Sequence, residues 1–274
     1  MNIFTIHFSA ALVIGLITGI MSGAFGIGGG TVCTPMLRLW LLMDPHVSIG
    51  TTMALIIPTA ISGALNYVRK KLVSFKVGKL LIIPSVIGVF LGALGTTMVH
   101  GRILMLSFAA LVAISGLDVS FGLIKNLIRK FYGDNLEAEV EEQKDTIAKV
   151  QTLDPAPSFV IIVGLLSGIM AGFFGVGGGF VLVPCFMYCL KMPIKSAFGT
   201  SLLVVAALSI PGTITHAAVG HVDPSLLIAM MLGSIPGSLL GSSLAIRLKD
   251  SLLRKAFGIL MLIVAGLMAF NELS

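Results

Sequence analysis

The chain carries an internal duplication, and this feature constrains its fold more than any other. Displaced by 149 residues, the sequence aligns with itself: residues 15–35 read GLITGIMSGAFGIGGGTVCTP and residues 164–184 read GLLSGIMAGFFGVGGGFVLVP, with 13 of 21 positions identical. The same offset pairs Gly50-Thr51 with Gly199-Thr200 and Gly92 with Gly241, without a gap. One register kept over so long a stretch indicates two homologous halves. We therefore expect one structural unit to occur twice.

The composition places both units in a membrane. Hydrophobic residues make up 56% of the 274 residues and charged residues only 11%, whereas a soluble domain carries about a quarter charged residues. Apolar runs such as 80–99 and 252–270 approach or reach the roughly 20 residues that an α-helix needs to cross the hydrocarbon core. The sequence therefore predicts an all-α, multi-pass membrane protein with the lipid bilayer as its solvent.

A single long polar stretch separates the halves. Residues 126–157 hold seven acidic and four basic side chains, and Asn135 to Val150 has helical character. The sequence thus predicts an N-terminal membrane repeat at 1–125, a charged linker at 126–157 and a C-terminal membrane repeat at 158–274.

The first segment of each half is interrupted by FGIGGG or FGVGGG, and glycine runs are poor helix interiors. If the pieces on either side form one crossing, the halves are parallel and the 18 Lys and Arg residues divide 10 to 8 between the two sides. If the pieces form a hairpin, the halves are inverted and 16 bases share one side, with only Arg38 and Arg102 on the other. The excess of basic residues in cytoplasmic loops favours inversion. We expect a cell (inner) membrane protein with both termini outside and the linker in the cytoplasm.

Each inverted repeat should hold about four to five helical elements, including a hairpin formed by the broken first helix. The expected elements are 5–25, 31–43, 48–68, 76–99 and 102–125, followed by 158–174, 180–191, 196–219, 222–246 and 250–270.

The glycine breaks are the candidate binding site. Inverted repeats with broken helices are typical of secondary transporters, and irregular backbone at membrane depth either is buried in protein or lines a cavity. Each break also begins a new helix, whose N-terminus favours anions. The candidate substrate-binding residues are the glycines of both breaks and the hydroxyl residues that follow: Gly26, Gly28, Gly29, Gly30, Thr31, Thr51, Thr52, Gly175, Gly177, Gly178, Gly179, Thr200 and Ser201. Helix packing is the alternative explanation of the glycines, and the one we favour for the spaced set that begins at Gly15 and Gly164.

Few other polar residues suggest chemistry. Asp118 is the only acid inside an apolar span and is a candidate coupling residue, although pairing with Lys125 or snorkelling explains it better. Asn66 and His216 are expected to line a vestibule, and His7, His46, His100 and His221 to lie at the membrane interface. No metal-ligand or catalytic spacing is present, so we expect neither an enzyme nor a cofactor or metal. The scattered bases do not form a nucleic-acid surface, and a homodimer is the one protein assembly that we include among the expected partners.

These motifs carry a family resemblance. The paired GxxxGxxxGxFGxGGG…P segments, with GTSLLVVAALSIPGTITHAAVGHVDPSLL and GSIPGSLLG in the second half, resemble the TauE/SafE family of sulfite and sulfonate exporters. The resemblance implies a permease that moves small sulfur-containing anions, generally outward, and its matching positions are the glycine cores, Pro35, Pro184 and the two Gly-Thr pairs. The charged linker is longer than the family pattern leads us to expect. An anion channel on the same scaffold remains the alternative to a transporter.

Overall fold

The computed structural model describes residues 3–121 and 155–273, and the regular structure in these two ranges is entirely α-helical. The linker prediction, including its helix at 135–150, falls outside the described residues. The helices are α1 (Ile3–Phe25), α2 (Gly30–Trp40), α3 (Pro45–Arg69), α4 (Phe75–Thr96), α5 (Gly101–Phe121), α8 (Pro157–Phe174), α9 (Gly179–Tyr188), α10 (Ile194–Ala218), α11 (Pro224–Arg247) and α12 (Asp250–Leu273).

Apart from the end of the element expected at 102–125, part of which lies outside the described residues, the helix boundaries lie within three residues of those expected from the sequence. The elements expected at 31–43 and 180–191 end earlier, at Trp40 and Tyr188. Leu42 and Lys191 take left-handed backbone conformations, with φ of 50° and 51°. The backbone N–H of the residue that follows each of them donates to a carbonyl six residues earlier, from Met43 to Leu37 and from Met192 to Phe186. A left-handed residue thus ends each short helix, here without the glycine that would have marked the end in the sequence.

Seven of the described helices are long and apolar enough to cross a membrane: α1, α3, α4, α8, α10, α11 and α12. Many large apolar side chains on their outer faces are exposed, among them Ile83, Ile228 and Phe270, as lipid-facing side chains should be. The charged residues of the described part lie in loops or within two turns of a helix end rather than in the middle of the helices. The chain is therefore an integral, multi-pass membrane protein.

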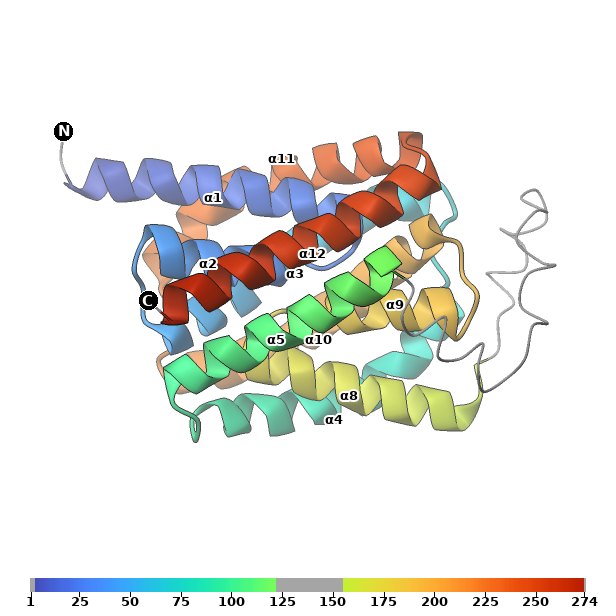
Figure 1. Ribbon diagram of the computed structural model, residues 1–274, viewed down its shortest axis with the longest axis horizontal. Helices are drawn as coiled ribbons and strands as arrows, with labels where there is room; N and C mark the ends of the chain where they lie inside the picture. Colours follow the sequence, from blue (N-terminus) through green and yellow to red (C-terminus); the bar gives the residue numbers. More distant parts are fainter. Residues whose placement is uncertain (1–2, 122–154, 274) are drawn as a thin grey trace.

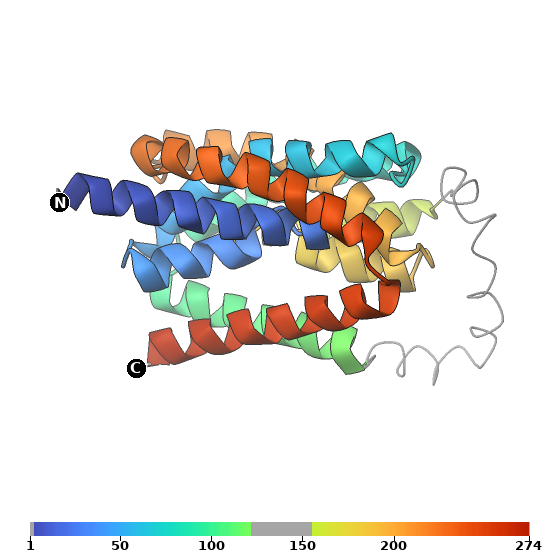
Figure 2. The ribbon, with the colours of Figure 1, turned by 90° about the horizontal axis from the view of Figure 1, so that it is seen from above.

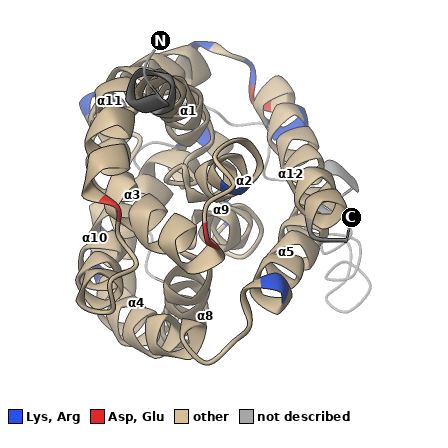
Figure 3. Ribbon diagram, turned by 90° about the vertical axis from the view of Figure 1, so that its left-hand side faces the viewer, with Lys and Arg blue, Asp and Glu red and all other residues tan. Residues whose placement is uncertain are grey.

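The helices pack in pairs that follow the repeat. The α1 helix lies along α11, and its repeat counterpart α8 lies along α4. The α3 and α10 helices pack against each other, as do α5 and α12, which lie together on one face (Figure 1, Figure 2). The short α2 and α9 helices lie inside the ring that the longer helices form (Figure 3).

Glycines allow the closest of these helix pairs to form. A Cβ added at Gly15, Gly19 or Gly23 would overlap the backbone of α11, and one added at Gly168 or Gly172 would overlap the backbone of α4. These glycines therefore serve helix packing, as the small-xxx-small spacing predicts.

The two halves enter the bundle from opposite ends. Both chain termini lie at the left of Figure 1, where α1 begins, whereas α5 ends and α8 begins at the right. Each of α1 and α8 is followed by a loop and a short helix that turns back toward its starting end (Figure 1). This arrangement agrees with the hairpin interpretation of the broken segments, which is the one that makes the repeats inverted.

Candidate functional site at the paired glycine loops

Two four-residue loops join α1 to α2 and α8 to α9, and their backbone explains the glycine runs. The φ angles are 69°, 74° and 89° at Gly26, Gly28 and Gly29. Their repeat counterparts Gly175, Gly177 and Gly178 have φ of 66°, 76° and 72°. L-residues with a side chain rarely adopt these conformations. The predicted breaks are therefore present, and three glycines in each are required by backbone conformation alone.

The two glycine loops meet at the centre of the protein. A Cβ added at Gly30 would lie 2.5 Å from the Val176 Cα, and one added at Gly179 would lie 2.6 Å from the Ile27 Cα. Each short helix thus begins against the loop that precedes the other. Both Gly28 and Gly177 also face the Cγ1 atom of Val205.

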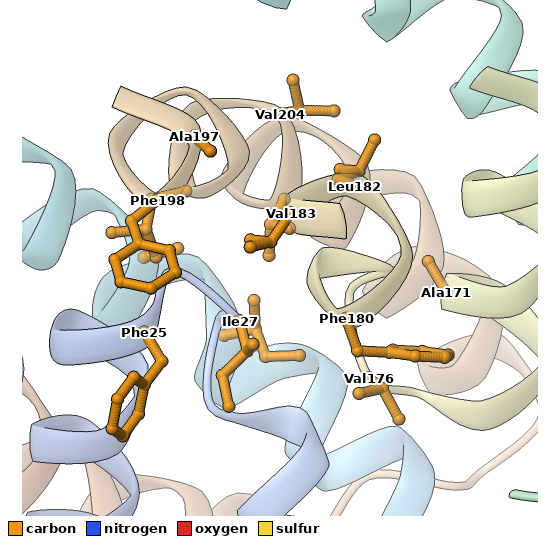
Figure 4. Packing of buried hydrophobic residues seen from close by; sticks show 14 of the residues in the cluster. Phe25, Ile27, Ala171, Val176, Phe180, Leu182, Val183, Ala197, Phe198 and Val204 are labelled. Atoms are coloured by element: carbon orange, nitrogen blue, oxygen red, sulfur yellow. The ribbon is translucent and has the colours of Figure 1, made fainter. Parts of the chain in front are cut away.

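Apolar side chains fill the space around this loop contact. Ile27 and Val176 are completely buried, and Figure 4 shows Ile27 between the Phe25–Phe198 pair and Phe180, with Val176 beside Phe180. The glycines predicted to bind the substrate thus lie together at the centre of the protein, where they are packed against backbone and apolar side chains. In this conformation the loop contact is closed.

The predicted hydroxyl residues differ in what they do. The Thr51 Oγ1 accepts the N–H of Asp223 at 2.9 Å, and the Thr200 Oγ1 accepts the N–H of Ser74 at 3.0 Å. These two bonds are related by the repeat, and each ties one helix to the start of another (α3 to α11, α10 to α4). Thr51 and Thr200 therefore hold the scaffold together rather than facing the glycine loops with unpartnered hydroxyls.

Thr31, Thr52 and Ser201 are completely buried, and their hydroxyls have no hydrogen-bond partner. The same is true of Thr18, Ser22 and Thr34, which lie in α1 and α2 and which the sequence analysis did not select, and of the Ser74 hydroxyl. The signal that could have found Ser22 and Thr34 is a departure from the repeat. The offset of 149 pairs Ser22 with Ala171 and Thr34 with Val183, whereas Thr18 pairs with another hydroxyl residue, Ser167.

The two loops are also anchored in related ways by one side chain each. The Tyr67 hydroxyl donates to the Gly23 carbonyl at 3.0 Å. At the equivalent position in the second half, the Nε2 of His216 lies 3.1 Å from the Gly172 carbonyl. The prediction that His216 lines a vestibule is therefore wrong, because the side chain is fully buried and directed at the end of α8. Asn66 likewise bonds to α11, through the Leu239 carbonyl at 2.9 Å, and so bridges two helices.

Three histidines that are separate in the sequence come together at the end of the bundle that holds the termini. The His221 ring lies 5.3 Å from the His46 ring and 5.7 Å from the His216 ring, between centroids. Burial lowers the pKa of His221 below its ordinary value, and His46 acts in the same direction while Asp44 opposes it. No set of three or more His, Cys, Asp or Glu side chains in the described ranges is arranged to hold a metal ion. The side chain of Asp118 and all of Lys125 lie outside the described part.

Comparisons with known proteins agree with this architecture. The family described as Sulfite exporter TauE/SafE matches residues 11–268. A probable membrane transporter protein of Xylella fastidiosa (strain 9a5c) is 30% identical over 254 residues, which cover 92% of this chain and 90% of the relative. The probable membrane transporter protein YunE of Bacillus subtilis is 28% identical over 244 residues, covering 86% and 88%. No solved structure gives a significant match.

Proposed function

Because the chain belongs to the sulfite exporter TauE/SafE family and is a membrane transporter, we propose that it carries small sulfur-containing anions such as sulfite or organosulfonates, in the outward direction. The family description supports the substrate class and the direction. The transport mechanism that we propose is alternating access, in which the two repeats move relative to each other about the glycine loops.

The observation that carries this proposal is the contact between the two loops. Each loop begins a short helix, and the first N–H that bonds back to the loop is that of Val32, to Gly29, in α2 and that of Val181, to Gly178, in α9. The N–H groups before these two belong to the unpaired helix start. Helix N-termini attract anions, and these two lie at the centre, near the start of the facing helix. A closed apolar contact between repeats that opens toward one side at a time is what alternating access requires.

The distribution of charge supports the orientation that we propose, with the termini outside and the linker in the cytoplasm. Of the 13 basic residues in the described part, 11 lie in loops or in terminal helix turns at the end where α8 begins (Figure 1). They are Arg69, Lys70, Lys71, Lys76, Lys79, Lys191, Lys195, Arg247, Lys249, Arg254 and Lys255. The positive-inside rule assigns this end to the cytoplasm. Cys189, an exposed thiol at this end, should react with a membrane-impermeant maleimide only after the cells are opened, and Cys189→Ser provides the background.

Transport in proteoliposomes tests the substrate and the mechanism. We expect saturable uptake of radiolabelled sulfite and counterflow that is stimulated by unlabelled sulfite on the opposite side, with sulfate, thiosulfate, taurine and sulfoacetate as competitors. Gly29→Leu and Gly178→Leu should abolish it, because both glycines have positive φ and their added Cβ atoms would lie 2.8 Å from the Thr18 Cγ2 and 2.6 Å from the Ser167 carbonyl oxygen.

Gly266→Leu is the matched control, since an added Cβ there meets no atom within 4 Å. Uptake without counterflow would favour a channel over a carrier. If no sulfur anion moves, or if transport survives both loop substitutions, the proposed function is wrong.

A further inference from the structure

We propose that the anion binds on one side of the loop contact only, in the N-terminal repeat, against a hydroxyl cluster formed by Thr18 and Ser22 of α1 and Thr52 of α3. This inference rests on the proposed function and deepens it, because it replaces two equivalent half-sites with a single asymmetric site. The ligand class is a small oxyanion, for which sulfite is the probe.

The hydroxyl cluster lies beside the start of α2. An added Cβ at Gly29 would lie 2.8 Å from the Thr18 Cγ2 and 3.3 Å from the Ser22 Cβ, so both residues flank the glycine that precedes α2. Cys33, in the first turn of α2, faces both Thr52 and Thr18. Three helices therefore bring these side chains to one place, next to the first N–H groups of α2.

The hydroxyls of the cluster are buried but unpartnered. Thr18, Ser22 and Thr52 are at most 1% exposed, and their hydroxyl oxygens have no nitrogen or oxygen partner, only the Cys33 thiol that Thr18 and Thr52 face. Other buried hydroxyls bond to the preceding helical turn, as Thr59 does to the Leu55 carbonyl and Ser209 to the Val205 carbonyl. The hydroxyls of Thr31, Thr34, Ser74 and Ser201 are unpartnered as well, but Thr18, Ser22 and Thr52 come from two other helices to the start of α2. Buried polar groups are normally satisfied, and a thiol is only a weak partner, so three such hydroxyls around one helix start indicate a ligand that accepts hydrogen bonds.

The chemistry of these donors fits a small oxyanion. Hydroxyl and backbone N–H groups are neutral donors, and the partial positive charge of the α2 N-terminus adds attraction without a fixed cation. Of the basic side chains in the described part, those of α2 and α3 lie at the far ends of their helices, as Arg38 and Arg69 do. An anion with three or more oxygens arranged around one centre can accept several of these bonds at once.

The second repeat lacks the same cluster. The counterparts of Thr18, Ser22 and Thr52 are Ser167, Ala171 and Ser201. The Ser167 hydroxyl already donates to the Gly164 carbonyl at 3.1 Å, which leaves Ser201 as the only unpartnered hydroxyl among the three counterparts. The neighbouring positions on the short helices differ in the same direction, because Cys33 is replaced by Leu182 and Thr31 by Phe180.

Sulfite binding to the purified full-length protein, measured anaerobically by titration calorimetry, tests the inference. Thr18→Val, Ser22→Ala and Thr52→Val should each weaken binding about tenfold, as the loss of one such hydrogen bond does. The matched control in the second repeat, Ser167→Ala, should leave Kd unchanged, because this hydroxyl already donates to the Gly164 carbonyl. Because the wild-type hydroxyls have no partner without ligand, the three test variants should also unfold at the same or a higher temperature than the wild type, which separates lost binding from lost folding.

Each outcome has one meaning. The one-sided site would be overturned if variants of both repeats weakened sulfite binding equally, or if Kd were unchanged in all three test variants. The proposed function would still stand in that case, provided that the wild type transports sulfite. A wild type that neither binds nor transports sulfite, sulfate, thiosulfate, taurine or sulfoacetate would overturn the proposed function together with this site.

Discussion

The loop contact makes a quantitative prediction at Gly177, whose position can be tested by a double-mutant cycle with Val205. An added Cβ at Gly177 would lie 2.6 Å from the Val205 Cγ1, while its next contacts, to Ile56, begin at 3.4 Å. The conflict is therefore with the tip of one side chain. Val205→Ala removes that atom, so the second substitution should relieve part of the damage that the first one causes.

The expected energies follow from the geometry. Gly177→Ala places a side chain at φ 76°, which costs roughly 1–2 kcal/mol, and overpacking adds about 1–3 kcal/mol, since ordinary carbon–carbon contacts are about 3.5–4.0 Å. Val205→Ala alone leaves a cavity that costs roughly 1–3 kcal/mol. In the double variant the methyl group introduced by Gly177→Ala occupies part of that cavity, so the sum of the single effects should exceed the double effect by about 1–3 kcal/mol.

Thermal unfolding in detergent provides the assay, with Gly220→Ala and Gly175→Ala as references. Gly220 has φ of 77° and open space around it, so its variant measures the backbone term alone. Gly175 conflicts with the Ile49 backbone, including its carbonyl oxygen at 2.7 Å, and should be additive with Val205→Ala. A coupling of about 2 kcal/mol corresponds to roughly 4–8 °C for a chain near this size. Additivity at Gly177, or a Gly177→Ala effect no larger than that of Gly220→Ala, would refute the loop contact described above.

Three further predictions concern the interface between α1 and α11, the Thr51 hydroxyl and the His221 side chain, and thermal unfolding tests each of them. Gly266→Ala should raise the unfolding temperature by a few degrees, because Ala is more stable than Gly in a helix interior by about 1 kcal/mol and no atom lies within 4 Å of the added Cβ. Gly19→Ala should lower the unfolding temperature, because its Cβ would force α1 away from α11. A rise with both variants would contradict the close packing of these two helices. Thr51→Val should destabilise the protein by about 1–3 kcal/mol, because the N–H at the start of α11 loses its acceptor, and an unchanged midpoint would show that this bond is dispensable. The folding stability should decrease from about pH 8 to about pH 5.5, because His221 binds a proton more readily in the unfolded chain than in the folded protein, where its pKa is lowered. The His221→Gln substitution should flatten this part of the stability profile. A profile that the substitution leaves unchanged would assign the effect to other groups.

The sequence predicted the membrane helices because their signals are local. Apolar length, the glycine breaks and N-terminal caps such as Asp44, whose Oδ1 accepts the His46 N–H at 2.8 Å, all lie within a few residues of the boundary that they define. The ends of α2 and α9 were misjudged because Leu42 and Lys191 take a conformation that glycine normally provides. Nothing in the run WLLM distinguishes this turn from a continuing helix.

The candidate site was predicted only in part, because hydrogen-bond partners depend on tertiary packing. Thr51 and Thr52 are adjacent in the sequence and equally buried, yet one hydroxyl accepts a backbone N–H from α11 and the other has no partner. In the sequence, Thr18 and Ser22 resemble other polar residues on a helix face, because their closeness to Gly29 arises only from the folded structure. The histidines came together for the same reason, since three separate segments end at one side of the bundle.

The repeat preserves the packing of the two halves more closely than their polarity. Positions that hold the bundle together keep their contacts across the offset of 149: Thr51 and Thr200 both accept an N–H at the start of a neighbouring helix, and Tyr67 and His216 both bond to the last turn before a glycine loop. Around the loops, by contrast, the hydroxyl residues Ser22, Thr31 and Thr34 of the first half are replaced by Ala171, Phe180 and Val183 in the second. A transporter whose repeats exchange conformations needs similar packing in both halves, because each must support the same two arrangements. Substrate binding has no such requirement, so selection for affinity can act on one half alone, and the unpartnered hydroxyls beside α2 are where we expect it to have acted.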